Sequence, residues 1–182
     1  MDLDVAPGDL EVVRELVNTL EVETESDALS SPRALVAWLR AHGLLHGGSA
    51  SRRDLEDARA LREAIRRLLL ENNGLGVRKE TARRLDRAAA QAGLTLRFDP
   101  SGTPHLEPAA KGVPGALGRI VAIVAAAMAD GTWSRLQACR AEDCRWAFYD
   151  RARNHSRHWC SMEVCGNRTK ARAYRARRAA GC

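Results

Sequence analysis

The chain has 182 residues, 45% hydrophobic and 29% charged, a balance typical of a folded protein rather than a disordered one. Its best apolar stretch, residues 120–129, is about half as long as a membrane-spanning helix, so we expect a buried helix and no membrane partner. The acidic N-terminus lacks a secretion signal, and the expected location is therefore the cytoplasm.

The net charge of +6 is unevenly distributed along the chain. Residues 139–182 carry eleven Arg or Lys and four Asp or Glu, whereas residues 1–138 carry eighteen basic and nineteen acidic residues. All the excess positive charge thus lies in the C-terminal quarter, a layout typical of a protein that meets phosphates. The competing interpretation is a solvated face that only keeps the chain soluble.

Apolar periodicity and capping residues predict helices through most of the first 130 residues. The first is expected to begin after Asp9, the second at Ser31-Pro32, and the third at Ser51, which forms a capping box with Asp54. Two more are expected at about residues 79–92 and 115–129. Aromatic residues make up only 4% of the chain, so Leu, Val, Ile and Ala must build the core.

A change of period interrupts the helices at residues 94–98, where apolar and polar residues alternate as in a half-buried strand. Residues 99–102 have turn chemistry, and residues 105–107 are expected to return as a second strand. The predicted fold of this part is therefore mainly α, with a small β-hairpin near residues 94–107.

Four cysteines near the C-terminus form two C-x4-C pairs separated by fifteen residues: Cys139, Cys144, Cys160 and Cys165. Four thiolates favour a closed tetrahedral site for one structural zinc ion per chain. The alternatives are unrelated buried cysteines, a redox dithiol, which more often has C-x2-C spacing, and an iron–sulfur cluster. Because four thiolates complete the site, we interpret His155 and His158 as loop or surface residues, and we assign no role to Cys182.

The order of residues around these cysteines predicts a treble-clef-like ββα zinc module. Residues 145–150 alternate like a strand, residues 158–161 are expected to return as its partner, and residues 168–178 form a basic helix. Gly166 is expected to supply a left-handed turn after the last cysteine, and Asn167 to brace the helix start. Metal binding would then provide much of the folding energy of so small a module.

The residues of this module resemble the CGNR zinc finger. The resemblance rests on the two cysteine pairs, on Phe148-Tyr149-Asp150-Arg151 with Arg153-Asn154, on Trp159-Cys160-Ser161-Met162, and on Cys165-Gly166-Asn167-Arg168 with Lys170-Ala171. It implies a zinc ion held by the four cysteines and a role in binding DNA.

The segment Leu16-Val17-Asn18-Thr19 resembles the start of the ABATE domain, described as a domain of bacterial stress-induced transcription regulators. The resemblance implies a helical ABATE-like domain over residues 1–136, followed by the zinc finger over residues 137–182. It also makes Asn18 and Thr19 candidates for lining a ligand pocket. The alternative for this pair is a helix C-terminal turn held by local hydrogen bonds.

The leading hypothesis is a transcription regulator that grips DNA phosphates with its C-terminal helix and hairpin loop. The predicted contacts are Arg151, Arg153, Arg157, Arg168, Lys170, Arg172, Arg175, Arg177 and Arg178. A homodimer and a small-molecule effector are left open.

Three other functions compete with DNA binding. One is a protein-interaction adaptor whose zinc module docks on an acidic partner. Another is RNA binding, with Trp146, Tyr149 and Trp159 stacking on bases. The third, an enzyme, is not expected, because the sequence shows no nucleophile–base pattern or phosphate-binding loop and a closed zinc site offers no open position.

Overall fold

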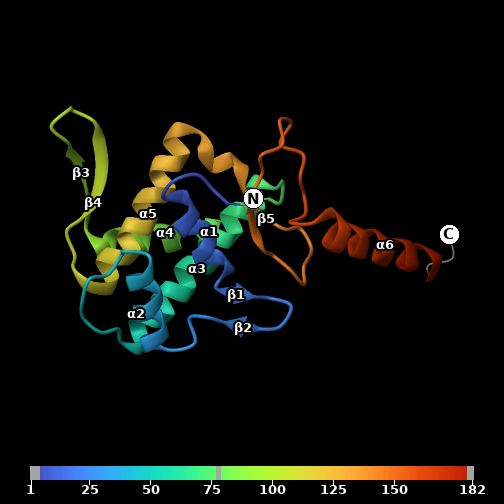
Figure 1. Ribbon diagram of the computed structural model, residues 1–182, viewed down its shortest axis with the longest axis horizontal. Helices are drawn as coiled ribbons and strands as arrows, with labels where there is room; N and C mark the ends of the chain where they lie inside the picture. The colour runs from blue at the N-terminus through green and yellow to red at the C-terminus, as the bar shows by residue number, and fades with distance from the viewer. Residues whose placement is uncertain (1–4, 77–78, 180–182) are drawn as a thin grey trace.

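The computed structural model describes residues 5–76 and 79–179 (Figure 1). Its α-helices are α1 (Leu10–Asn18), α2 (Pro32–Ala41), α3 (Arg52–Asn72), α4 (Lys79–Ala92), α5 (Gly112–Asp130) and α6 (Asn167–Ala179). Its strands are β1 (Leu20–Glu21), β2 (Ser26–Asp27), β3 (Leu94–Phe98), β4 (Pro104–Pro108), β5 (Leu136–Ala138) and β6 (Ala147–Tyr149). They form three antiparallel pairs, which confirms a mainly α fold with small β elements.

Two of the three predicted helix starts use the capping residues that the sequence indicates. The Ser31 hydroxyl accepts a hydrogen bond from the Ala34 amide, and Ser51 and Asp54 form the complete capping box of α3. The first helix also begins directly after Asp9, as predicted, but Asp9 does not cap it, because its side chain makes no cap hydrogen bond. Its own backbone is already helical, with φ −64° and ψ −18°, instead of the extended conformation that a capping residue usually adopts.

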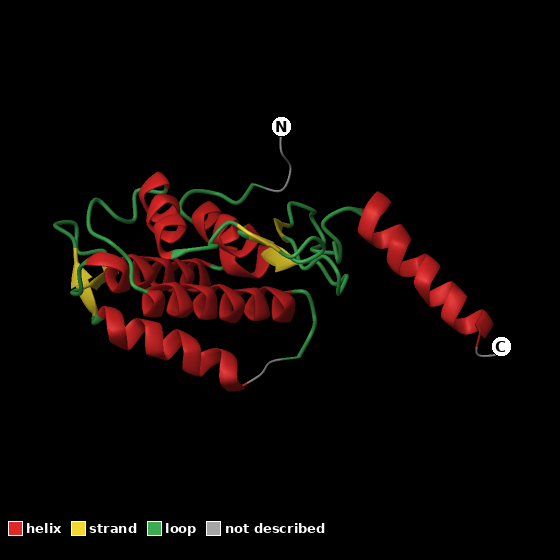
Figure 2. Cartoon of the chain, turned by 90° about the horizontal axis from the view of Figure 1, so that it is seen from below, coloured by secondary structure: helices red, strands yellow, loops and turns green. Residues whose placement is uncertain are grey.

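The helices of the body are stacked in layers, with α3 and α5 in the middle, α1 and α2 on one side and α4 on the other (Figure 2). Val13, Leu16, Leu39, Ile65 and Ile120 are completely buried between them. The predicted buried helix is thus confirmed as α5. It begins earlier than predicted, and at 19 residues it is long and apolar enough to suit a membrane span by composition, although half of that segment is buried in this core.

The β3–β4 hairpin has the predicted strands, paired from Leu94↔Pro108 to Phe98↔Pro104. The expectation of a half-buried strand is wrong for most of its length. Leu96 is 58% exposed and Phe98 is 65% exposed, whereas Leu94 packs against the core. The hairpin lies beside α5 at one edge of the body, and its tip stands clear of the other helices (Figure 1).

The strand pairing of the C-terminal module differs from the prediction. Residues 158–161 do not form a strand; β6 pairs instead with β5, which precedes the first cysteine. All three residues of β5 are buried against α3 and neighbouring elements, whereas residues 158–161 are only half-buried. Burial beside the body therefore decides which segment becomes the partner, and the ββα order is retained as β5, β6 and α6.

The C-terminal module shares the hydrophobic core of the helical body. Leu136, Ala138, Ala147 and Tyr149 belong to the same buried cluster as Leu16 and Ile65. The predicted boundary between residues 136 and 137 falls inside β5. The two parts are consequently joined by packing as well as by the chain.

Candidate metal centre and nucleic-acid interface

The first cysteine pair lies in the connection between β5 and β6. Cys139 directly follows β5, and its amide donates a hydrogen bond to the Trp146 carbonyl over 2.9 Å. The Cys144 amide bonds back to the Ala141 carbonyl over 3.1 Å and closes a tight turn. Arg145 then adopts a left-handed conformation with φ 56°, after which the chain enters β6.

The second pair ends at the start of α6. Cys165 lies in a π-helical turn, Met162–Gly166, that runs directly into α6. The expectation of a left-handed turn at Gly166 is wrong, because this glycine does not have a positive φ. Its missing side chain serves packing instead, since a Cβ there would lie 2.5 Å from the Met162 Sδ.

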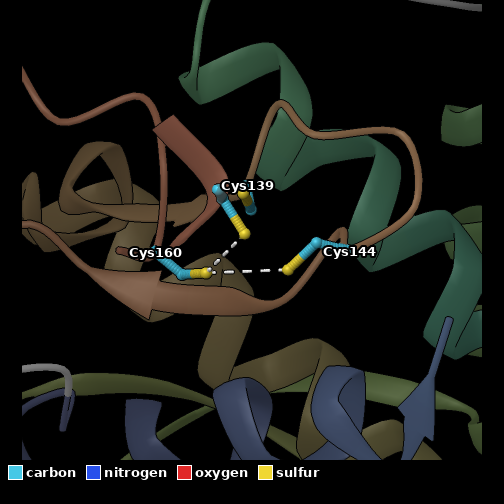
Figure 3. Close-up of side chains that lie close together, drawn as sticks. Cys139, Cys144 and Cys160 are labelled. Carbon is cyan, nitrogen blue, oxygen red and sulfur yellow. Dashed lines mark hydrogen bonds between the residues drawn. The ribbon is translucent and has the colours of Figure 1, made fainter. Parts of the chain in front are cut away.

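The four sulfur atoms converge, as Figure 3 shows for Cys139, Cys144 and Cys160. They all lie within 4.8 Å of one another, with Sγ–Sγ distances of 3.6 Å for Cys144–Cys160 and 3.7 Å for Cys160–Cys165. A tetrahedron with zinc–sulfur bonds of about 2.3 Å has edges of about 3.8 Å. The residues present therefore fit zinc, and the cluster is the site of one structural zinc ion, held by four thiolates.

The thiols influence one another's acidity. Hydrogen bonds from Cys144 and Cys160 lower the pKa of Cys139 to about 2. The hydrogen bond to Cys139 in turn raises the pKa of Cys144 to about 12, and Cys139 and Cys144 raise the pKa of Cys160. Zinc binding requires all four thiols to lose their protons, because the thiolate is the form that binds the metal.

Side chains from the helical body hold the backbone of the zinc module. Asn18 at the end of α1 brackets Ala147: its amide group donates to the Ala147 carbonyl over 3.0 Å and accepts from the Ala147 amide over 2.7 Å. The buried Arg66 of α3 donates to the Arg145 carbonyl over 2.9 Å and to the Val17 carbonyl over 2.8 Å. These bonds fix the first cysteine turn to the body.

Asn73, just after α3, joins both halves of the module. Its amide nitrogen donates to the carbonyls of Ala138 and His158, over 2.8 Å and 3.0 Å. Its oxygen contacts the His158 Nδ1 at 2.9 Å. His158 lies in a loop, as expected, but it is half-buried and binds the helical body instead of facing solvent. His155 is exposed in the loop, as expected.

The predicted DNA-binding helix is the most exposed helix of the described chain. None of the residues of α6 is buried, and the helix extends away from the body (Figures 1 and 2). It carries six basic residues and no acidic ones: Arg168, Lys170, Arg172, Arg175, Arg177 and Arg178. Tyr174, its aromatic residue, is 55% exposed.

Acidic side chains engage the first two arginines of α6. Asp143, between the first two cysteines, lies 2.8 Å from Arg172 and 3.3 Å from Arg168. Glu23, in the loop between β1 and β2, lies 2.6 Å from Arg168. A hydrogen bond from Arg172 lowers the pKa of Asp143, and one to Glu23 raises the pKa of Arg168. These pairs orient the base of the helix.

The three arginines of the loop after β6 have separate surroundings. Arg151 donates to the Val5 carbonyl over 2.8 Å, and Arg153 is exposed. Arg157 donates to the Cys160 carbonyl over 2.6 Å, and its guanidinium lies 4.7 Å from the centre of the Phe148 ring. Arg157 therefore braces the second cysteine pair, and its contact with DNA stays a prediction.

The aromatic residues proposed for base stacking are buried or half-buried. Tyr149 is buried in the common core, and Trp146 and Trp159 are half-buried. Rings in these positions offer little free face to a base, which disfavours base stacking by these three residues.

The candidate ligand residues at the end of α1 line an open cavity of about 380 Å³ together with Trp38 and His42. The Thr19 hydroxyl bonds locally to the Leu16 carbonyl over 2.7 Å, as the simpler interpretation predicts. Asn18 instead makes the distant contacts with Ala147 described above. Ligand binding by this pair stays a prediction.

Sequence reasoning missed the residues that join the two parts. Local sequence patterns do not mark Asp143 or Asn73 as residues with distant contacts. Arg62 and Arg66 were not singled out, although they are spaced i, i+4 along the apolar stripe of α3 and are both buried. A charged pair within an apolar stripe was the available signal for buried contacts.

The comparisons with known proteins agree with this architecture. The CGNR zinc finger family matches residues 135–178. The ABATE family, whose description reads "Putative stress-induced transcription regulator", matches residues 10–132. No match was found among curated proteins. Because the second match covers more than half of the sequence, the chain belongs to the ABATE family, and it carries a CGNR zinc finger at its C-terminal end.

Proposed function

We propose that this protein regulates transcription by binding duplex DNA through α6. The observation that carries the proposal is a helix with six basic residues, no acidic residue and no buried residue. Such a helix gains nothing from the core of its own chain, and its like charges repel one another. Phosphates of a duplex would neutralise that charge and release counterions.

The zinc site supports this role by fixing where the helix begins. Cys165 lies just before α6, and the Thr169 hydroxyl donates to the Cys165 carbonyl over 2.8 Å. Four thiolates leave no open position for water or substrate, so the metal has a structural role in this proposal and no enzymatic activity is expected. In this proposal the protein acts in the bacterial cytoplasm, because its DNA target lies there.

The test is fluorescence anisotropy of the zinc-loaded chain with mixed-sequence duplex DNA at several salt concentrations. We expect binding whose logarithm falls linearly with the logarithm of salt concentration. The double variant R175E/R177E should weaken binding at least tenfold, because neither residue forms an ion pair with an acidic residue of the described chain. The matched control R83E/R87E reverses two exposed arginines of α4 and should have a much smaller effect.

A protein-interaction adaptor remains the second candidate, because an exposed basic helix also suits an acidic protein surface. Equal affinities of R175E/R177E and its control for DNA, or no binding at low salt, would overturn the DNA proposal. Binding to single-stranded RNA in preference to duplex DNA would favour the RNA-binding alternative.

A further inference from the structure

A cavity with a volume of about 610 Å³ lies where the helical body meets the first cysteine turn. Its walls come from α3, from α4, from Val22 in the loop between β1 and β2, and from Arg145 directly after the zinc ligand Cys144. Its volume is in the range of about 300–1,000 Å³ that small-molecule sites usually have. Neither the zinc site nor the proposed DNA-binding helix accounts for it.

The charged residues around this cavity are predominantly basic. Among the residues that the structure describes, they are Arg66, Arg67, Arg84, Arg145, Glu63 and Glu80. Four guanidinium groups thus face two carboxylates, and the excess of positive charge in a concave site attracts an anion. Guanidinium groups are also suited to bidentate contact with a carboxylate or a phosphate.

The arginines of the cavity differ in how many hydrogen bonds and ion pairs they form with other residues. Arg66 is saturated by Glu63 and by backbone carbonyls, and forms part of the wall. Arg67 forms no hydrogen bond or ion pair with other residues that the structure describes. Arg84 has its ion-pair partner Glu80 at 3.6 Å, an exposed and long contact. Arg67 and Arg84 therefore retain donors for a ligand.

Arg145 connects the cavity to the metal centre. Its backbone is left-handed between Cys144 and Trp146, and its carbonyl accepts the hydrogen bond from Arg66. Its Nη1 donates to the Arg140 carbonyl over 3.1 Å, and its Nη2 lies 4.0 Å from Glu142, which is highly exposed. An anion between α3 and α4 would meet this third guanidinium on the zinc-binding turn itself.

We propose that this cavity binds a small anionic molecule, carrying carboxylate or phosphate groups, through Arg67, Arg84 and Arg145. A bound anion bridges the two helices of the body and the first cysteine turn, so its binding free energy stabilises their relative position. The inference stands apart from DNA binding by α6, because it concerns other residues and a different class of ligand.

The floor of the cavity favours a small molecule over a DNA backbone. Ala64, Arg66, Leu70 and Thr81 line it and are all buried. A small organic anion can reach these buried residues more easily than a phosphate that is fixed on the broad, rigid surface of a duplex. A DNA contact at the cavity is kept as an outcome of the test.

The test is calorimetric titration of the zinc-loaded full chain with two probes, citrate and inorganic phosphate, with chloride at matched ionic strength as the reference. The variant R67Q/R84Q should lower the affinity for the better probe at least tenfold. The matched control is R33Q/R97Q, which removes the same charge from one exposed arginine without a described partner and from one with an exposed carboxylate at 3.6 Å. It should keep the affinity within twofold.

Three results would overturn the proposal. The first is binding of both probes no stronger than chloride. The second is an equal loss of affinity in R67Q/R84Q and R33Q/R97Q, which would indicate a general charge effect. The third is a loss of duplex DNA affinity in R67Q/R84Q with unchanged probe binding, which would assign the arginines to the DNA interface. Melting temperatures of both variants in chloride check that the chains are folded.

Discussion

Arginines of α3 and of α6 have opposite surroundings in the same molecule. Arg62 and Arg66 are buried, and each donates several hydrogen bonds to carboxylates or backbone carbonyls. The arginines of α6 are exposed or half-exposed, and the last three have no acidic partner in the described chain. A buried guanidinium must be satisfied within the protein, whereas an exposed one is available to a partner. The same residue type therefore stabilises the fold in one region and provides a binding surface in the other.

Removal of zinc should have the largest effect, and it should act on α6 and not on the body around α3. Metal binding contributes on the order of 10 kcal/mol to the folding of small zinc modules, and α6 begins directly after a zinc ligand. We expect chelation to abolish the ordered start of α6 and DNA binding, while the body around α3 stays helical. Far-UV circular dichroism and limited proteolysis measure both effects. Cys160→Ser should reproduce them and Cys182→Ser should not; full DNA binding by the chelated chain would contradict the expectation.

Within α3, a buried and an exposed arginine can be compared directly. Arg66→Met removes hydrogen bonds to Val17, Arg145 and Glu63, and should cost about 3 kcal/mol in the free energy of unfolding. Arg53→Met is the matched control: Arg53 pairs with Asp57 at 3.1 Å, but its side chain is 65% exposed, and its loss should cost less than about 0.5 kcal/mol. Urea denaturation measures both; equal costs would contradict the structural role of Arg66.

Arg62, the other buried arginine of α3, pairs with Asp27, and this pair should make the stability of the protein depend on pH. Burial alone would raise the pKa of Asp27, but the hydrogen bonds and charge of Arg62 outweigh it, and the pKa lies below the usual 3.8. A lowered folded pKa stabilises the protein above pH 3.8, and this contribution disappears as pH falls through the folded value. Asp27→Asn should therefore cost about 2 kcal/mol near neutral pH and progressively less below pH 4. A pH-independent difference in unfolding free energy between the two chains would contradict this assignment.

Sequence patterns predicted what depends on local chemistry. The helix starts at Ser31 and Ser51, the end of α4 and the four zinc ligands need only neighbouring residues or the motif itself. The patterns did not predict which strand pairs with β6, since residues 136–138 and 158–161 are both short and the body decides between them. Nor did they identify the contacts of Asn18, Arg66 and Asn73 with the zinc module, which join residues 65 or more positions apart. Such contacts depend on how distant elements pack, which local periodicity does not specify.

The smallest expected effect is a change in DNA affinity when an ion pair at the base of α6 is removed. Asp143 holds Arg168 and Arg172, so it competes with phosphates for both. Asp143→Asn should raise DNA affinity about threefold, in keeping with the small free energy of a partly exposed ion pair. Glu142→Gln is the matched control, because it removes the same charge from the preceding residue. The Glu142 side chain is 91% exposed and lies 4.0 Å from Arg145. A greater gain for Asp143→Asn than for Glu142→Gln would show that the ion pairs restrain the DNA-binding surface. A loss of affinity would instead show that Asp143 orients α6 for binding, and the base of the helix would then belong with the structural arginines of α3.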